Sequence, residues 1–517
     1  MINPAQTIKR ATVGIIILVL ISKVIGFGRE MIIAYRFGTS IEYDIYLVAA
    51  SIPLAIYTLV AGLSNYFIPQ MSRATANRTD IAPISTLWPE FLYSLSGCIA
   101  ISIGIFAFSP LFLNLIAPGF DEGKIAEAVY LTRIMTVIIV FSYVETFFRS
   151  ALNNEKNFNI PAFGPIIANI IIIGSIILFA EAYSTKAILY GVISGYLAQI
   201  IVLHFSFRRL RFLQGIRKFS YSLTGSGQFL TAILFILVIE GSVQVYAVVD
   251  RFFASSMEGG IISALGYSYV LYNVPISIFA FALATAIFPY FSESFELKQY
   301  DTARHIFYRA VTLSMLIAVP IMIIFWIFIE DIVVISFHRG AFDSNSIDQT
   351  VYVMRYFIPG MLGHFLFWVI TRVYYAGRVY LILMANVALV VISKLILAYY
   401  LVENIGAVGL ALSTTISHGA GALFLVALSN RVLPGIDWKK ILNYFLKLAG
   451  VSIVVYWVAS IVANWDIFLN DGMAGRIMNT LIQLSITAAT FFVCGIIFRI
   501  PDLRALLIKI TGKRIIG

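Results

Sequence analysis

Long apolar runs separated by short polar segments are the dominant pattern along the chain. Most of the runs reach the ~20 residues that a helix needs to cross a hydrocarbon core of ~30 Å. The pattern predicts an all-α polytopic membrane protein with about fourteen transmembrane helices. Their approximate ranges are 12–36, 43–70, 88–116, 126–150, 160–181, 187–207, 226–254, 261–291, 305–329, 347–373, 379–402, 405–430, 441–463 and 475–498.

Composition supports this class. The chain has 517 residues, of which 60% are hydrophobic and only 12% are charged, too few charges to cover a soluble protein of this size. The net charge of +10 is spread over short loops, a topology signal rather than a nucleic-acid-binding surface. Cys98 and Cys494 both lie in apolar runs, where thiols are usually inert, so neither a disulfide nor a metal site is predicted.

The charges of the loops alternate along the chain. One set of loops is basic, from Lys9 and Arg10 before the first span to Arg499 and its neighbours after the last. The other set carries few basic residues and includes acids such as Asp121 and Glu403. Because cytoplasmic loops are enriched in Lys and Arg, both termini are predicted to be cytoplasmic.

An internal repeat divides the chain. Pro53 and Pro69 in the second span recur as Pro275 and Pro289 in the eighth. Other matched features are Arg133 with Arg355, Arg149 with Arg372, and Gly119-Phe120-Asp121 with Ala341-Phe342-Asp343.

Each repeat contains six helices in the same order, so the two halves are predicted to be parallel lobes related by an axis along the membrane normal. The predicted parts are an N-terminal lobe at 1–212, a basic cytoplasmic linker at 213–223, a C-terminal lobe at 224–432, and two further helices with a cytoplasmic tail at 433–517. Two lobes around a central cavity are typical of a transporter that works by alternating access.

Several charged residues lie within apolar spans, where an unpaired charge costs ~3 kcal/mol or more. Lys23 and Arg29 lie six residues apart in the first span, which puts them ~120° apart around a helix. Arg251 follows Asp250 at the matching depth of the seventh span. It is either a further cation of the site or half of a local ion pair.

Several motifs, in order along the chain, resemble the signature of the lipid II flippase family (MurJ, also called MviN). The motifs are Ser22–Glu30, Phe37–Ser40 with Asp44, Ala117–Phe120, Leu152–Asn154 with Ile160–Pro165, Arg339–Asp343, and Gly406–Ala411.

The resemblance implies the fold of the multidrug/oligosaccharidyl-lipid/polysaccharide exporter superfamily. It also implies a flippase in the bacterial cytoplasmic membrane that moves an undecaprenyl-pyrophosphate-linked glycan from the inner to the outer leaflet. In peptidoglycan synthesis this glycan carrier is lipid II.

Lys23, Arg29 and Asp44 are the positions that carry over from the family signature, and Arg251 is added here as a fourth candidate for substrate binding. The resemblance further implies that the two C-terminal helices form a groove for the lipid tail. Membrane lipids are the other expected partners, and enzymes of cell-envelope synthesis remain open as partners.

The chain departs from the family pattern at arginine positions. Tyr57 and Thr58 stand where family members usually carry an arginine pair in the second helix, and Val270 stands where they carry one in the eighth. Lys23 replaces an arginine of the first helix. These departures leave open a second substrate class, another polyprenyl-linked oligosaccharide such as an O-antigen or exopolysaccharide unit.

Other functions fit the sequence less well. An envelope glycan polymerase or ligase needs a large external loop, and the longest predicted ones, near 330–346 and 464–474, are short. A drug antiporter of the same superfamily usually has about twelve helices, and a scaffold has no need of charges within the membrane. The sequence therefore predicts a transporter and not an enzyme.

Glu240 and Lys394 lie in the middle of otherwise apolar spans and are predicted to form an ion pair within the second lobe. The resemblance implies a cation site in this region in some relatives, which a lysine would replace with a tethered charge. If Glu240 instead faced hydroxyls such as Ser413 or Thr414, a cation site would be the better interpretation. No cofactor is predicted, and the sequence leaves open whether the membrane potential or a monovalent cation supplies the energy.

The loop charges generate a topology prediction. A reporter enzyme fused after Gly340 should be active outside the cytoplasm, and one fused after Arg211 should be active inside it. A reversed result at either position would contradict the predicted topology.

Overall fold

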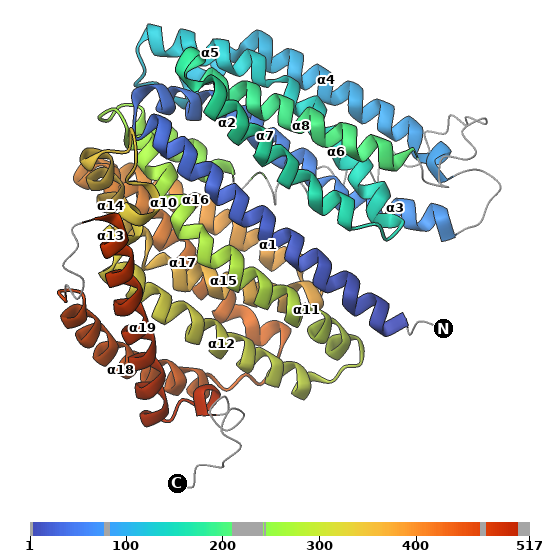
Figure 1. Cartoon of the computed structure of the whole chain (residues 1–517). Helices are drawn as coiled ribbons and strands as arrows, with labels where there is room; N and C mark the ends of the chain where they lie inside the picture. The colour runs from blue at the N-terminus through green and yellow to red at the C-terminus, as the bar shows by residue number, and fades with distance from the viewer. Residues whose placement is uncertain (1–3, 77–82, 209–240, 242–243, 466–471, 505–517) are drawn as a thin grey trace. The chain divides into compact units, whose positions relative to one another are not determined.

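The computed structural model describes residues 4–76, 83–208, 241, 244–465 and 472–504. Within these ranges the chain forms helices and no β-strand (Figure 1). Of the described helices, 11 are long and apolar enough to cross a membrane, or up to 12 when one bent pair is counted as a single span. The predicted all-α membrane fold is confirmed.

The predicted spans correspond to observed helices, the seventh only where the structure describes it, at 241 and 244–254. The first half contains α1 (Pro4–Phe37), α2 (Ile41–Gly62), α3 (Ser64–Ala76), α4 (Pro83–Ile116), α5 (Glu122–Met135), α6 (Val137–Asn154), α7 (Asn159–Tyr183) and α8 (Lys186–Phe207). The second half contains α10 (Ile261–Pro275), α11 (Phe281–Glu296), α12 (Tyr300–Ile327), α13 (Ile329–Phe337), α14 (Ser344–Phe357), α15 (Gly360–Ala376), α16 (Tyr380–Ile405), α17 (Ala407–Val432), α18 (Trp438–Val462) and α19 (Met473–Ile497).

Several spans are broken rather than straight. Pro275 ends α10 and is followed by a π-helical turn at Ile276–Ala280 before α11 begins. Proline has no N–H to donate to a carbonyl of the preceding turn. Where a helical hydrogen bond is lost, the helix can widen locally into a π-helical turn. Before Pro359, α14 and α15 meet at an angle of 52°, since the residue ahead of a proline disfavours the helical conformation.

By its contacts the chain divides into two compact units. Unit 1 comprises Met1–Ser263 with Arg339–Asp343, and unit 2 comprises Ala264–His338 with Ser344–Gly517. This partition is based on packing and differs from the predicted sequence repeat. The two six-helix lobes therefore stay a prediction.

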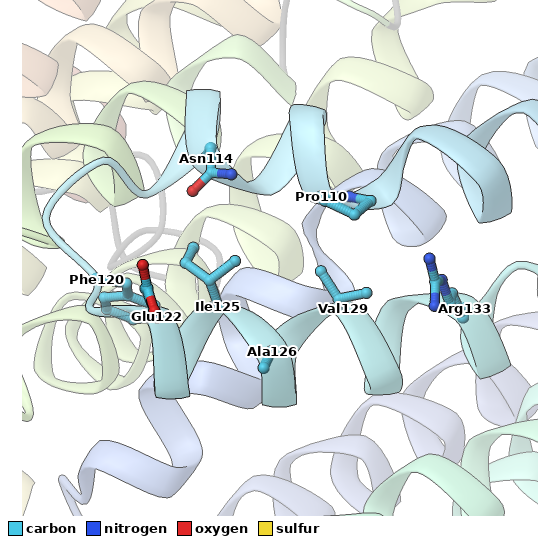
Figure 2. Close-up of a pocket in the computed structure, with 8 residues that line it drawn as sticks. All are labelled: Pro110, Asn114, Phe120, Glu122, Ile125, Ala126, Val129 and Arg133. Carbon is cyan, nitrogen blue, oxygen red and sulfur yellow. The ribbon is translucent and has the colours of Figure 1, made fainter.

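Unit 1 packs around helix pairs and an aromatic core. α7 lies against both α1 and α8, while α2 lies against α5 and α6. Phe67, Phe91 and Phe147 are buried together, with ring centroids of Phe91 and Phe147 4.5 Å apart. α4 and α5 pack against each other and border a groove (Figure 2).

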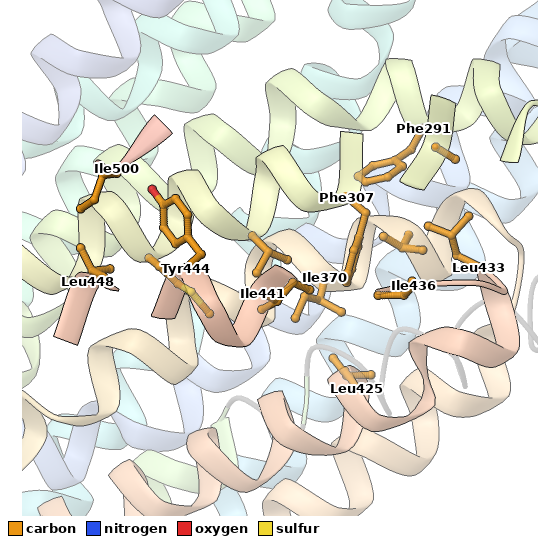
Figure 3. Close-up of a cluster of buried hydrophobic side chains, with 14 of the residues drawn as sticks. Phe291, Phe307, Ile370, Leu425, Leu433, Ile436, Ile441, Tyr444, Leu448 and Ile500 are labelled. Carbon is orange, nitrogen blue, oxygen red and sulfur yellow. The ribbon is translucent and has the colours of Figure 1, made fainter. Parts of the chain in front are cut away.

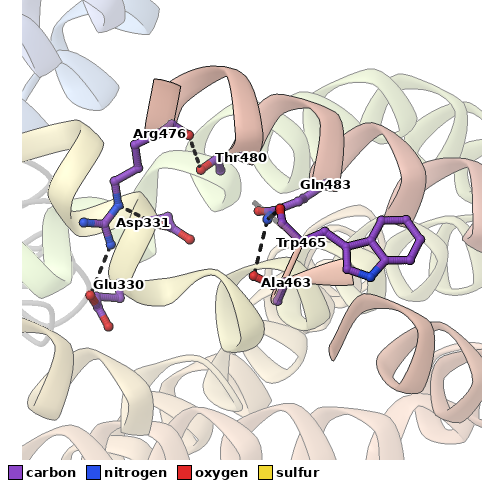
Figure 4. A network of polar contacts seen from close by, with 7 residues as sticks. All are labelled: Glu330, Asp331, Ala463, Trp465, Arg476, Thr480 and Gln483. Carbon is purple, nitrogen blue, oxygen red and sulfur yellow. Dashed lines mark hydrogen bonds and ion pairs between the residues drawn. The ribbon is translucent and has the colours of Figure 1, made fainter. Parts of the chain in front are cut away.

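Unit 2 has a larger core that includes the C-terminal helices. Phe307 of α12, Ile370 of α15 and Leu448 of α18 belong to one buried cluster (Figure 3). Arg476 at the start of α19 donates through Nε to Asp331 at 2.6 Å and through Nη2 to Glu330 at 3.1 Å, both in α13 (Figure 4). The last two helices are thus packed into unit 2.

The tight α7–α8 pair generates a stability prediction. A Cβ added at Gly195 of α8 would lie 2.9 Å from the carbonyl oxygen of Ala168, whereas a Cβ at Gly174 of α7 would meet no atom within 4 Å. Gly195→Ala should destabilise the protein by ~1–3 kcal/mol through overpacking. The control Gly174→Ala should be neutral or stabilising by up to ~1 kcal/mol, because alanine favours a helix. Thermal unfolding in detergent measures both, and equal effects would refute the packing argument.

Candidate functional site

Arg29 of α1 is held by two polar neighbours in unit 1. Its Nε donates to the carboxylate of Glu30 at 3.1 Å, and its Nη2 also contacts that carboxylate. Its Nη1 donates to Oδ1 of Asn169 in α7 at 3.0 Å. Guanidinium has five N–H donors, so two remain for a further acceptor. The side chain is 33% exposed, which leaves these donors accessible.

Lys23 lies six residues earlier on α1 and is exposed. It makes no hydrogen bond or ion pair with any residue that the structure describes. Because six residues turn a helix by ~600°, Lys23 and Arg29 point in directions ~120° apart. A ligand that contacts both must therefore span two faces of α1.

Two buried tyrosines connect Arg29 with Arg251. Tyr43 and Tyr46 of α2 have ring centroids 5.9 Å apart. Both tyrosines lie within the electrostatic range of Arg29 and of Arg251. Two of the predicted cations thus border the same part of α2, although the sequence places them more than two hundred residues apart.

Asp44, the predicted acidic member of the site, is 3% exposed and fully engaged. Its carboxylate accepts the backbone N–H of Gly260 at 2.6 Å and that of Ser263 at 2.7 Å, and it also accepts the Ser263 hydroxyl. These are the first N–H groups of α10, which lack partners within the helix. Its contacts are those of a helix cap, and a role in substrate binding stays a prediction.

Both copies of the repeated loop motif make close contacts in unit 1. The N–H of Ala341 donates to the carbonyl oxygen of Tyr35 at 2.8 Å, and Gly340 has a φ of +59° where a Cβ would collide with that carbonyl. The N–H of Gly119 donates to the Ser255 hydroxyl at 3.1 Å. The first loop thus contacts the segment after 244–254, and the second contacts the end of α1.

A buried carboxylate was missed in the sequence. Glu145 of α6 is fully buried and accepts Nε of Arg149 at 2.7 Å and Nε2 of Gln199 in α8 at 2.8 Å. The spacing of Glu145 and Arg149 by four residues was the available signal, because such residues lie on one face of a helix. In the sequence, Arg149 was identified only as the match of Arg372 in the repeat.

Lys394 of α16 is fully buried in unit 2. Its ammonium donates to the carbonyl oxygen of Leu410 at 2.8 Å, to the Ser413 hydroxyl at 3.0 Å and to the Thr414 hydroxyl at 2.8 Å, all in the first turns of α17. Glu240 lies outside the described residues, so the predicted ion pair stays a prediction. The three oxygens can hold an ammonium, and no group of three His, Cys, Asp or Glu suited to a metal occurs in the described ranges.

Two histidines lie next to this cage. The rings of His364 and His418 have centroids 4.5 Å apart. Nδ1 of His364 shares a hydrogen bond of 3.3 Å with the Tyr272 hydroxyl, and Nδ1 of His418 lies 3.0 Å from the Thr414 carbonyl oxygen. Both rings are hydrogen-bonded packing residues between helices.

A sequence model for the lipid II flippase MurJ family matches residues 33–470 of this chain. The chain belongs to the lipid II flippase MurJ family. It is accordingly a multi-pass protein of the bacterial cytoplasmic membrane.

Curated members of the family are similar over most of their length. The chain is 25% identical to the probable lipid II flippase MurJ of Buchnera aphidicola (subspecies Baizongia pistaciae) over 474 residues, covering 88% of this chain and 90% of the relative. It is 24% identical to the lipid II flippase MurJ of Burkholderia cenocepacia, covering 85% and 88%.

Solved structures share the fold. A lipid II flippase MurJ in an inward closed conformation superposes with a TM-score of 0.77 at 22% identity, covering 92% of this chain and 98% of that one. An inward-facing multidrug resistance transporter of the MATE family superposes with a TM-score of 0.65 at 13% identity, covering 80% and 94%.

Within the family pattern, an aromatic pair occupies one of the missing arginine positions. The ring of Tyr57 in α2 packs against that of Tyr196 in α8, with centroids 4.8 Å apart. Tyr196 is also within the electrostatic range of Arg29. An aromatic pair therefore lies near Arg29 at this position.

The Lys394 cage generates a second stability prediction. Lys394→Met should destabilise the protein strongly if the ammonium pairs with Glu240, because a lone carboxylate would remain in an apolar span. The double variant Glu240→Leu with Lys394→Met should be less destabilised than Lys394→Met alone. Thermal unfolding in detergent measures this, with Lys440→Met, at an exposed site, as the control. A double variant as unstable as the sum of the two single variants would exclude the pair.

Proposed function

We propose that this protein is a flippase that moves lipid II, an undecaprenyl-pyrophosphate-linked peptidoglycan precursor, from the inner to the outer leaflet by alternating access. The observation that carries the proposal is the family match, which runs through nearly all the described helices. In this proposal the termini are cytoplasmic, as the loop charges indicate. The protein transports its substrate and changes no covalent bond in it.

The proposed ligands of the pyrophosphate are Lys23, Arg29 and Arg251. A guanidinium binds phosphate oxygens in pairs and stays charged in a membrane environment. Glu30 and Asn169 hold the Arg29 guanidinium in place while two of its donors stay available. Lys23 adds an exposed, flexible charge that can follow a moving headgroup.

The contacts at Asp44 and at the two repeated loops all lie within unit 1, on the predicted external side. Asp44 ties α2 to the start of α10, and the Ala341 N–H ties its loop to the end of α1.

A second substrate class is supported by one observation. Tyr57 and Tyr196 form a tilted aromatic pair at a position where the resemblance implies an arginine, and aromatic rings commonly pack against sugar rings. Another polyprenyl-linked oligosaccharide is therefore the alternative cargo. The complementation experiment described next distinguishes lipid II from this alternative cargo.

The functional prediction concerns complementation. The protein should sustain growth of a bacterium depleted of its own lipid II flippase. The variant with Lys23→Ala and Arg29→Ala should fail to do so while reaching the membrane in normal amounts, because two cations that meet the pyrophosphate are lost.

The controls separate the possible outcomes. Lys186→Ala removes one cation that lies over the Tyr130 ring, away from the proposed site, and should leave growth intact. Failure of the unaltered protein to complement, together with rescue of a strain that lacks an O-antigen or exopolysaccharide flippase, would establish the alternative cargo. Full complementation by the double variant would remove Lys23 and Arg29 from the site.

A further inference from the structure

A groove between α4 and α5 in unit 1 is separate from the cationic site. It has a volume of about 540 Å³ and is lined on the α5 side by Glu122, Ile125, Val129 and Arg133. On the α4 side it is lined by Pro110 and Asn114. Figure 2 shows Arg133 rising from α5 towards α4 at one end of the groove, with Phe120 and Glu122 at the other. The walls are partly apolar and partly polar, with Arg133 at one end and Glu122 at the other.

The Arg133 guanidinium is anchored by a defect in α4. Pro110 has no N–H, so the carbonyl oxygen of Phe106, four residues earlier, loses its usual helical donor. Nε of Arg133 donates to that oxygen at 3.2 Å and lies at the same distance from the Ser109 hydroxyl. The guanidinium also lies 5.2 Å from the centre of the Phe106 ring. The Ser109 hydroxyl also donates to the Phe106 oxygen, at 3.1 Å. These contacts position the Arg133 guanidinium at one end of the groove.

The rest of this guanidinium has no partner in the described part of the chain. Its two Nη atoms make no hydrogen bond there, and no carboxylate forms an ion pair with it. A charge in an apolar surrounding is costly unless an anion or water meets it. Four N–H donors on Nη1 and Nη2 therefore border the groove.

The depth of Arg133 suits the phosphate layer of a bilayer. The continuous span Glu122–Asn154 has 33 residues, which is ~50 Å of helix centred near residue 138. The Cα of Arg133 then lies ~8 Å from the membrane midplane on the side of Glu122. Arginine side chains extend several ångströms towards the interface, and those of a helix lean towards its N-terminus, here the same direction. The guanidinium thus comes close to the boundary of the hydrocarbon, at ~15 Å.

We propose that this groove binds an anionic glycerophospholipid of the outer leaflet, with Arg133 as the ligand of its phosphate. A single guanidinium matches the single charge of a phosphodiester. The carboxylate of Glu122 at the other end of the groove disfavours a more highly charged pyrophosphate. Asn114 offers an amide to the hydroxyls of a glycerol headgroup, and the apolar wall of Ile125 and Val129 lies against the acyl chains.

The sequence repeat supplies a matched control. Arg355 of α14 follows Asp343 by twelve residues, as Arg133 follows Asp121. The span that contains Arg355, Ser344–Ala376, also has 33 residues. Arg355 is exposed and forms no bond to a proline-freed carbonyl within the described ranges. It tests what an interfacial arginine contributes without the anchoring seen at Arg133.

The experiment is native mass spectrometry of the full-length protein in mild detergent, titrated with phosphatidylglycerol or phosphatidylcholine. Arg133→Gln should weaken binding of the first phosphatidylglycerol roughly fivefold to tenfold, the effect of one interfacial charge. Binding of phosphatidylcholine should not change. Arg355→Gln should leave both lipids unaffected. Ala126→Phe, which fills the groove and leaves Arg133 in place, should cause the same loss as Arg133→Gln.

Three results would overturn the proposal. Unchanged phosphatidylglycerol binding by both Arg133→Gln and Ala126→Phe would exclude the groove. Equal losses in Arg133→Gln and Arg355→Gln would show a general effect of interfacial charge. Displacement of phosphatidylglycerol by equimolar undecaprenyl pyrophosphate would assign the groove to the transported lipid. Since the readout is lipid binding, it does not depend on the outcome of the complementation test.

Discussion

The absence of water from the hydrocarbon core is the constraint on which the rest of this structure depends. Each backbone N–H and carbonyl in a span needs a partner within the protein, so the described chain is helical and its irregular points are repaired locally. After Pro275 a π turn re-forms the backbone bonds, and beside Pro110 the Arg133 side chain reaches the freed carbonyl of Phe106. Two prolines thus lie beside two different local features, one a π-helical turn and the other a candidate lipid site.

The same constraint governs the charges. Glu145 is fully buried between Arg149 and Gln199, and Lys394 is buried among three oxygens of α17. Arg29 differs because it is partly exposed and keeps donors free after it has bound Glu30 and Asn169. A fully satisfied buried charge fixes the packing of helices, whereas a partly satisfied charge at an accessible surface can bind a ligand. This difference separates the candidate binding residues from the structural ones.

Two arginines at matched positions of the predicted repeat have different neighbours. Arg149 pairs with Glu145 four residues earlier, while Arg372 has Trp368 at that position, 5.5 Å from its guanidinium to the ring centre. The rings of Phe288 and Tyr375 also lie within 6 Å of Arg372. A carboxylate holds its arginine through a directional ion pair, whereas an aromatic cluster attracts it with less directionality. The two matched positions thus carry the same cation, and the groups that support it differ.

The local sequence pattern was sufficient to predict the helices. The length of an apolar run and the charge of a loop are properties of adjacent residues, and the thickness of the bilayer sets the length that a run must reach. The described helices therefore match the predicted spans, and the signature motifs identified the family. The partners of the charges depended on tertiary structure. Asp44 meets Gly260 across 216 residues and Arg29 meets Asn169 across 140, distances over which a sequence carries no periodic signal. Glu145 looked like a residue near a loop until α8 was packed against it, and the role of Arg133 appeared only once α4, with its proline, lay beside α5. Which side chains meet depends on how helices rotate and cross, and many distant packing contacts decide that together.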